Sequence, residues 1–350
     1  MRNASVQNSD LVTGDEVTNS ARAVLPAILP GCHPSQADKA IAAYLGLAIG
    51  DALGATVEFM TPREITAQFK LHTKILGGGW LRLKPGQVTD DTTMALALGE
   101  SILLAGRIDA LAAARAFDAW MRAKPVDIGA TVRRSLLAFR KTGIPETPPN
   151  EHDAGNGAAM RTLPVALATL DLSEETVRAA CRAQAHVTHH NPLSDAATET
   201  LALMVRDALL GADKLDLLHG RAHQLVKQHP EFVFRAVRQR QNPSGYIVET
   251  LQAVFQAFFD TDSFEDCLID VVNRGGDADT TGAITGMLAG AVYGLASIPR
   301  HWRQGLDAEV RSACETQARR LVKVGTNLFA APTSALTARR PSSPELPRLV

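Results

Sequence analysis

Two pairs of aspartates, each followed by threonines, are the residues in this sequence best suited to chemistry. Asp90 and Asp91 stand in VTDDTT, and Asp277 and Asp279 stand far downstream in GGDADTT. Taken singly, either motif is explained as the N-cap of a helix, where Asp and Thr are favoured. A cap needs only one side-chain oxygen, however, and both pairs offer only carboxylate and hydroxyl oxygens. Because Mg²⁺ and Mn²⁺ prefer such ligands, the two motifs together predict a site for two metal ions.

Other polar residues could complete such a site, but each also has a simpler explanation. Glu58 stands just after a glycine-rich helical stretch, where a solvated acid at a helix end is equally expected. Asp127, in KPVDIGAT, is expected on a turn, and Asp is common in turns for local reasons. Gly155, Asn156 and Gly157 precede an expected helix, so their backbone amides could hold a phosphate. A turn uses the same residues.

The histidines of AHVTHHNPLSDAA do not form a recognisable zinc motif. His186, His189 and His190 have spacings of three and four residues, but no HExxH and no pair of thiolates accompany them. We therefore expect one of them to contact a substrate and the others to be structural. Dinucleotide-binding, P-loop and hydrolase-elbow glycine motifs are absent from the sequence.

The composition indicates a helical, globular protein that is not specialised for nucleic acid. Of 350 residues, 45% are hydrophobic, which is enough for a large core, and the net charge of -1 provides no field that attracts polyanions. Four isolated cysteines suggest neither disulfides nor a thiolate zinc site, which fits a reducing cytoplasm. Apolar residues recur at three- and four-residue spacing in DALAAARAFDAWMRA, SDAATETLALMVRDALLG and YIVETLQAVFQAFF. The predicted fold class is all-α, and Ser173 is expected to cap another helix.

Glycines repeat at four-residue spacing in two of the expected helices. The first stripe holds Gly46, Gly50 and Gly54, and the second holds Gly282, Gly286, Gly290 and Gly294. Because glycine inside a helix costs about 0.5–1 kcal/mol relative to alanine, such stripes predict helices whose backbones pack closely. The alternative is drift in an Ala- and Gly-rich composition.

The domain boundaries follow from composition. We expect a flexible N-terminal extension over residues 1–36, a single domain over 37–330 and a disordered tail over 331–350, which is rich in Pro and Ser. The run Thr280–Pro299 contains no charge, but it is rich in Gly and Ala and follows two aspartates. We expect a buried helix of a soluble protein there, since acids are costly in lipid.

In this order the motifs resemble those of the ADP-ribosylglycohydrolase family. The segments that carry the resemblance are GLAIGDALGATVEFMT, VTDDTTMALAL, DAGNGAAMR, THHNPLSDAA and GGDADTTGAITGMLAGAVYG, and it spans about residues 38–328. Three further segments, GGGWLRLKPGQVTDDT, KPVDIG and SGYIVETLQ, are most similar to members that act on dinitrogenase reductase, the nitrogenase iron protein.

The resemblance implies a compact all-α domain with two Mn²⁺ or Mg²⁺ ions in a cleft. The implied metal ligands are Thr89, Asp90, Asp91, Asp277, Asp279 and Thr280. The implied catalytic residues are Glu58, which would act on the attacking water, and Asp127, near the scissile ribose. The implied ADP-ribose contacts are Gly155, Asn156 and Gly157 at the diphosphate, with His189 and Tyr246 lining the pocket.

The implied reaction is hydrolysis of the N-glycosidic bond between ADP-ribose and an arginine side chain, which would reactivate dinitrogenase reductase. The implied partners are that ADP-ribosylated protein and a PII-type signalling protein, with membrane contact only through a partner and a cytoplasmic location. The alternative is another protein target, as for an immunity protein that reverses a toxin's modification. Ala130 stands where close relatives tend to have Asn, so the fine positioning of the substrate is expected to differ from theirs. The residues before the domain could be a docking arm, a misassigned start or a partner-blocking extension.

Overall fold

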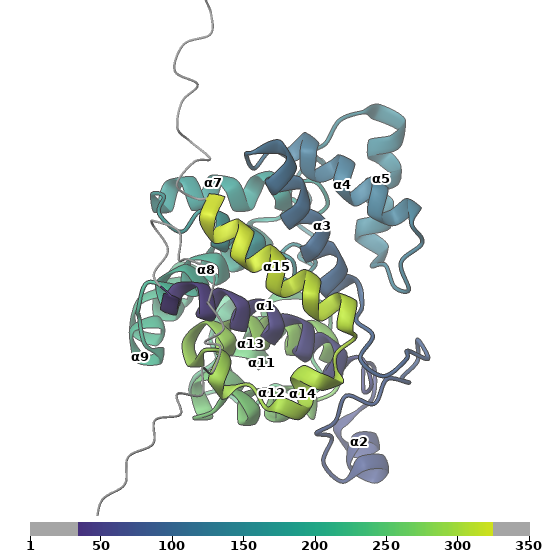
Figure 1. Ribbon diagram of the computed structural model, residues 1–350, viewed down its shortest axis with the longest axis vertical. Coiled ribbons are helices and arrows are strands. Elements are labelled where there is room, and N and C mark those ends of the chain that lie inside the picture. The colour runs from purple at the N-terminus through teal and green to yellow at the C-terminus, as the bar shows by residue number, and fades with distance from the viewer. Residues whose placement is uncertain (1–33, 325–350) are drawn as a thin grey trace, which may run out of the picture. The chain divides into compact units, whose positions relative to one another are not determined.

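The computed structural model describes residues 34–324, which form helices and no strand, so the predicted all-α fold is confirmed (Figure 1). The helices are α1 (Pro34–Gly54), α2 (Pro62–Phe69), α3 (Asp90–Ala105), α4 (Ala110–Arg122), α5 (Ala130–Thr142), α6 (Leu163–Ala168), α7 (Glu174–Ala185), α8 (Pro192–Leu209), α9 (Lys214–Leu217), α10 (His223–Gln228), α11 (Ile247–Asp260), α12 (Phe264–Val272), α13 (Ala278–Tyr293), α14 (Arg300–Gly305) and α15 (Ala308–Val324). Short helical turns are η1 (Leu218–Ala222), η2 (Pro230–Phe232) and η3 (Leu295–Ser297). The predicted extension over 1–36 and tail over 331–350 stay predictions, since almost all of these residues lie outside the described range.

The two glycine stripes bring α1 and α13 into direct backbone contact, as the spacing predicts. A Cβ atom added to Gly50 would lie 2.0 Å from the carbonyl oxygen of Gly282. One added to Gly286 would lie 2.0 Å from the carbonyl oxygen of Gly46. The prediction is wrong only at Gly294, which ends α13 with φ 77° and whose Cβ would meet open space. There the glycine provides the positive φ with which the chain leaves the helix, and it makes no helix contact.

Other helices enclose this central pair and complete the core. Helices α15 and α3 pack against α1, while α8, α11 and α12 pack against α13 (Figure 1). The Gln317 side chain of α15 joins two of these helices. Its oxygen accepts a hydrogen bond from Tyr44 of α1, and its amide donates to the Leu96 carbonyl of α3 at 3.0 Å. The side chain fits because Gly99 leaves room for it on α3.

Two further predictions about helices have clear outcomes. Ser173 caps α7, since its hydroxyl accepts a hydrogen bond from the Thr176 amide at 3.3 Å. The uncharged run Thr280–Pro299 contains most of α13, whose residues from Ala278 to Ala291 are all buried in the core. Within residues 34–324 no helix combines the length and apolarity needed to cross a membrane.

Candidate functional site

The two aspartate pairs lie at the starts of α3 and α13 and face one another. Asp90 and Asp91 form the first turn of α3, whereas Asp277 precedes α13 and Asp279 lies in its first turn. A hydrogen bond across the two helix starts joins the pairs, because Thr280 donates its hydroxyl to Asp91 Oδ2 at 3.3 Å. Close packing of α1 against α13 and of α3 against α1 therefore brings together acids that are distant in sequence.

None of these aspartates serves as the ordinary side-chain cap of its own helix. Thr89, the N-cap residue of α3, and Asp277, the N-cap residue of α13, both lack a capping hydrogen bond from the side chain. The first turn of α3 is instead held by Asp51 of α1, which is fully buried. The Asp51 carboxylate accepts hydrogen bonds from the Thr89 amide at 2.9 Å, the Thr92 amide at 3.1 Å and the Thr92 hydroxyl at 2.5 Å. Asp90 and Asp91 are thus not needed to cap the helix on which they lie.

Glu58 reaches the same place from the turn that follows α1. Carboxylate oxygens of Glu58, Asp277 and Asp279 lie within 4.8 Å of one another, a grouping that could hold a metal ion. The indole of Trp80 donates a hydrogen bond from Nε1 to Glu58 Oε2 at 2.6 Å. The exposed Trp80 ring thereby holds the Glu58 carboxylate in place beside the aspartates.

Asp127 lies in the loop between α4 and α5 and lines a cleft of about 390 Å³ together with Glu58. That loop touches the metal-ligand candidates directly, since the Gly129 amide donates to Asp90 Oδ2 at 3.2 Å. Ala130, the first residue of α5, also lines the cleft. The cleft lining contains Glu58, Asp90, Asp277, Asp279 and Thr280, whereas Thr89 and Asp91 are buried beneath it.

The GNG loop forms the floor of the cleft together with His189. A Cβ on Gly155 or Gly157 would lie 2.9 or 2.7 Å from the His189 ring, so the ring itself requires glycine at both positions. The Asn156 side-chain amide donates a hydrogen bond from Nδ2 to Asp277 Oδ2 at 2.6 Å and thereby orients a candidate metal ligand. The expectation that a helix follows directly is wrong, because α6 begins only at Leu163, after a run of turns.

His189 is linked to a buried arginine through one hydroxyl group. Arg161, fully buried, donates to the Thr188 hydroxyl at 2.7 Å, and that hydroxyl lies 2.8 Å from His189 Nδ1. Burial, together with the nearby Arg161 charge, lowers the pKa of His189 to about 3.

Tyr246 stands beside the glycine loop at the start of α11. An antiparallel backbone bridge pairs Tyr246 with Gly155, and the backbone amide of Asn156 donates to the Gly245 carbonyl at 3.0 Å. The Tyr246 side chain is 41% exposed and is not part of the cleft lining, to which Gly245 belongs. Tyr246 therefore lies next to the GNG loop through its backbone, whereas its side chain is not among the groups that line the cleft.

The clustered acids are buried close to one another, so their charged forms are unfavourable unless cations are bound. Burial raises the pKa of Glu58 to about 8, a shift that the charges of Asp277 and Asp127 reinforce and the Trp80 hydrogen bond opposes. Burial and the Asp127 charge raise the pKa of Asp90 to about 7. Burial also raises the pKa values of Asp91, Asp127, Asp277 and Asp279. Among the described residues, no salt bridge compensates any of these six carboxylates.

These residues fit hard divalent cations. One buried oxygen, Asp91 Oδ1, has no hydrogen-bond partner, which is costly for a carboxylate unless a cation contacts it. The surrounding donors are carboxylate and hydroxyl oxygens, the set that Mg²⁺ and Mn²⁺ prefer. Cations would remove the repulsion that raises the pKa values of these acids.

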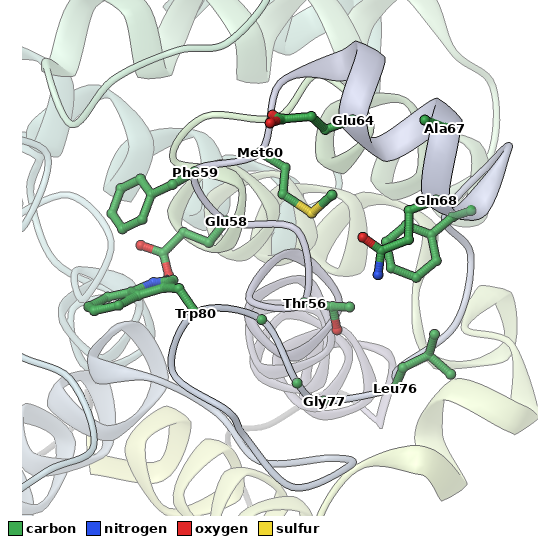
Figure 2. Close-up of a pocket in the computed structure, with 13 residues that line it drawn as sticks. Thr56, Glu58, Phe59, Met60, Glu64, Ala67, Gln68, Leu76, Gly77 and Trp80 are labelled. Carbon is green, nitrogen blue, oxygen red and sulfur yellow. The ribbon is translucent and has the colours of Figure 1, made fainter.

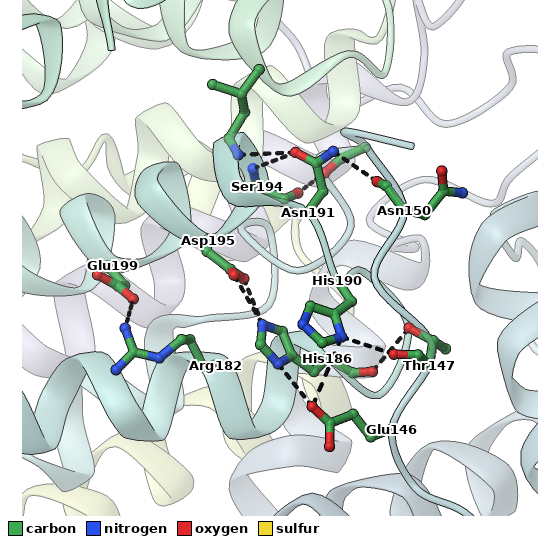
Figure 3. Close-up of polar contacts among 12 residues, drawn as sticks. Glu146, Thr147, Asn150, Arg182, His186, His190, Asn191, Ser194, Asp195 and Glu199 are labelled. Carbon is green, nitrogen blue, oxygen red and sulfur yellow. Dashed lines mark hydrogen bonds and ion pairs between the residues drawn. The ribbon is translucent and has the colours of Figure 1, made fainter. Parts of the chain in front are cut away.

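His186 and His190 lie outside the cleft, in a bridge between a loop and two helices (Figure 3). The His186 ring contacts Glu146 at 3.2 Å through Nδ1 and Asp195 at 2.9 Å through Nε2, and it stacks on His190 at 3.6 Å. His190 Nδ1 lies 2.8 Å from the Thr147 carbonyl, so that nitrogen carries a proton and cannot bind a metal ion. Both histidines therefore have a structural role, as the sequence interpretation expects.

Comparison with known proteins identifies the family. The family model for ADP-ribosylglycohydrolase matches residues 33–330. The chain belongs to this family. It is 50% identical over 288 residues to the ADP-ribosyl-[dinitrogen reductase] glycohydrolase of Rhodospirillum rubrum, covering 81% of this chain and 95% of that protein. It is 34% identical to the ADP-ribosylarginine hydrolase Tri1 of Serratia proteamaculans, covering 86% and 84% of the two chains.

A solved structure supports the fold as well. A chain described as an ADP-ribosylglycohydrolase-related protein complex superposes with a TM-score of 0.74 and 37% sequence identity. The match covers 83% of this chain and 99% of that chain. The family glycohydrolase fold therefore extends over nearly all of the described residues.

Sequence reasoning missed three residues that shape the site. Asp51 follows Gly50 in the first glycine stripe, and a charged residue inside so apolar a helix was a signal of a buried role. Arg161 likewise interrupts the small and apolar stretch GAAMRTLP. Trp80 offered no comparable signal, since an isolated tryptophan is most simply a core or rim residue.

Proposed function

We propose that this protein removes ADP-ribose from a modified arginine side chain of dinitrogenase reductase and so reactivates it. The observation that carries the proposal is 50% identity over 95% of the length of the Rhodospirillum rubrum glycohydrolase, whose name states that activity. The cleft supports it, because it places paired acids beside a glycine loop of the kind that accommodates a diphosphate.

We further propose that two divalent cations, Mn²⁺ or Mg²⁺, are held by Thr89, Asp90, Asp91, Asp277, Asp279 and Thr280. When bound, such cations orient the ribose hydroxyls and lower the pKa of a water molecule in the cleft. The unpartnered Asp91 Oδ1 and the uncompensated carboxylates support this assignment.

The protein's own side chains would then divide the work of hydrolysis. The bond between the ribose C1 and the guanidine nitrogen breaks, water supplies the new oxygen on C1, and the guanidine leaves with a proton. Glu58, held by Trp80 through one oxygen, would accept the proton of the attacking water. Asp127, which also lines the cleft, would act next to the ribose and deliver a proton to the guanidine. Gly155, Asn156, Gly157, His189 and Tyr246 would hold ADP-ribose.

The activity is tested by ADP-ribose release from ADP-ribosylated dinitrogenase reductase, with and without added Mn²⁺, beside an ADP-ribosylserine peptide. Mn²⁺-dependent release from the reductase alone is expected. Release that survives exhaustive chelation would overturn the metal assignment. Full turnover in Asp127→Asn would contradict the role of Asp127, and unchanged activity in Glu58→Gln would contradict that of Glu58.

A second target is tested by the same assay. The 34% identity to Tri1, an ADP-ribosylarginine hydrolase, favours arginine linkage without specifying dinitrogenase reductase. Release from free ADP-ribosylarginine but not from the modified reductase would therefore indicate another protein substrate, such as a toxin's target. On the family resemblance we also propose a cytoplasmic location and regulation by a PII-type protein, which a pull-down with purified PII protein tests.

A further inference from the structure

A groove of about 970 Å³ lies beside the cleft and has no part in the chemistry described above. It is open to solvent and is bounded by the turn after α1, by α2 and by residues 76–80. Glu58, Phe59 and Trp80 line both the groove and the cleft. Figure 2 shows these three side chains together at one end of the groove, with Gln68 and Leu76 at the other. The groove therefore continues outward from the place where a modified arginine would be cleaved.

The apolar wall of the groove is fixed in position by backbone contacts. Phe59 has the left-handed φ of 62°, which is unfavourable for a bulky residue, and its ring is 63% exposed. Its amide donates to the Gly276 carbonyl at 2.7 Å, and the Gly276 amide donates to the Met60 carbonyl at 3.0 Å. These bonds hold the Phe59 ring 5.4 Å from that of Trp80. A strained backbone that presents an aromatic ring to solvent indicates a binding surface.

Exposed basic side chains are frequent in the segment that bounds the groove, although none of them is part of the groove lining. Residues 59–84 contain five exposed basic side chains and none of them forms an ion pair within the described residues: Arg63, Lys70, Lys74, Arg82 and Lys84. The lining itself contains two acids, Glu58 and Glu64, and the Glu64 carboxylate accepts a hydrogen bond from the Thr61 amide at 2.7 Å. The basic side chains beside the groove attract a partner that carries acidic residues.

We propose that this groove binds the polypeptide that flanks the ADP-ribosylated arginine of the protein substrate. An apolar side chain of that polypeptide packs against Phe59 and Leu76, and acidic residues beyond it face the exposed basic side chains of residues 59–84. The proposal rests on the proposed function and adds to it the part of the substrate that lies outside ADP-ribose. Recognition of the protein is thereby separated from recognition of the nucleotide.

Steady-state kinetics on two substrates tests this separation. The full-length chain is assayed with Mn²⁺ on ADP-ribosylated dinitrogenase reductase and on free ADP-ribosylarginine. Leu76→Asp places a charge in the apolar part of the groove, and Lys70→Glu/Lys74→Glu reverses two exposed charges of the segment that bounds it. The matched controls are Leu215→Asp on α9 and Lys141→Glu on α5, which are also exposed but lie elsewhere.

Both groove variants are expected to raise the KM for the modified reductase about tenfold, the effect of losing one strong interface contact. Their kcat/KM for ADP-ribosylarginine should match that of the wild type, as should both substrates' kinetics in the controls. Equal losses on the two substrates, or no loss on either, would overturn the proposal. If the wild type hydrolyses ADP-ribosylarginine but not the reductase, the groove does not bind this polypeptide and the proposal is overturned, while arginine-linked hydrolysis stands. If the wild type hydrolyses neither substrate, the proposed function fails and this proposal fails with it.

Discussion

The glycine contact between α1 and α13 predicts that a single methyl group at Gly50 will disturb both stability and metal binding. A Cβ at this position would lie 2.0 Å from the Gly282 carbonyl oxygen and 2.3 Å from its carbonyl carbon. Ordinary contact between heavy atoms begins at about 3.5 Å, so the helices would have to separate by roughly 1.5 Å. The clashing atoms belong to a helix backbone and cannot rotate away as a side chain would.

The size of the effect follows from two opposing contributions. Overpacking a core costs about 1–3 kcal/mol or more, and this clash lies at the severe end because the contact is with backbone. Replacing glycine by alanine inside a helix raises the stability of that helix by about 1 kcal/mol. We therefore expect Gly50→Ala to lower the free energy of unfolding by about 2 kcal/mol. Since Asp51 and Asp279 sit on the separating helices, affinity for Mn²⁺ should fall as well.

Urea unfolding followed by circular dichroism, and Mn²⁺ titration by calorimetry, measure the two effects. The matched control is Gly220→Ala, because Gly220 is exposed in η1 and its Cβ would have no atom within 4 Å. That variant should be neutral or up to about 1 kcal/mol more stable. If Gly50→Ala were as stable as Gly220→Ala and bound Mn²⁺ like the wild type, the reasoning about the helix contact would be refuted.

Three further perturbations have defined outcomes. Asp51→Ala removes the carboxylate that holds the first turn of α3, and a Mn²⁺ titration should show about a tenfold loss of affinity. Although burial disfavours the protonated ring of His186, its contacts with Asp195 and Glu146 favour that ring more, so the pKa of His186 is raised. The protonated ring therefore contributes fully to the free energy of unfolding at low pH, and this contribution is lost as pH rises. In urea unfolding, His186→Gln should lower the free energy of unfolding more at about pH 5.5 than at about pH 9. Burial raises the pKa of Glu58 to about 8 and that of Asp90 to about 7, above their unfolded values. The chelated protein should therefore gain thermal stability as pH falls from about 8 to about 5.5, and added Mn²⁺ should stabilise it more at the higher pH.

Much of the fold could be predicted because its signals are local. Helix periodicity identified α4, α8 and α11, and Ser173 marked the start of α7. The glycine stripes even predicted which helix faces touch, since a residue that destabilises a helix repeats at four-residue spacing mainly where a close contact compensates its cost. The same reasoning was wrong for Gly294, because glycine is also common at helix ends and its spacing cannot distinguish a helix end from a helix contact.

The candidate site was predicted less completely, because its supporting contacts are made between distant segments. The pairing of Asp90 and Asp91 with Asp277 and Asp279 could be inferred from their matching chemistry alone. The bond from Trp80 to Glu58 depends instead on how a loop folds back over the end of α1, and no sequence pattern encodes that. The glycines of the GNG loop illustrate a different limit. They suggested a phosphate site, but in the structure they also make room for the His189 ring.

The contact between α1 and α13 also has a consequence for synthesis. The two helices come from opposite ends of the described chain, and each presents a surface of bare backbone and small residues that only the other covers. On the ribosome, α1 emerges early and has to wait for α13 until translation is almost complete. Closing so long a loop is slow. A truncated nascent chain therefore cannot assemble the acid cluster, so partial products of translation should carry no hydrolase activity and should depend on chaperones until the last helices arrive.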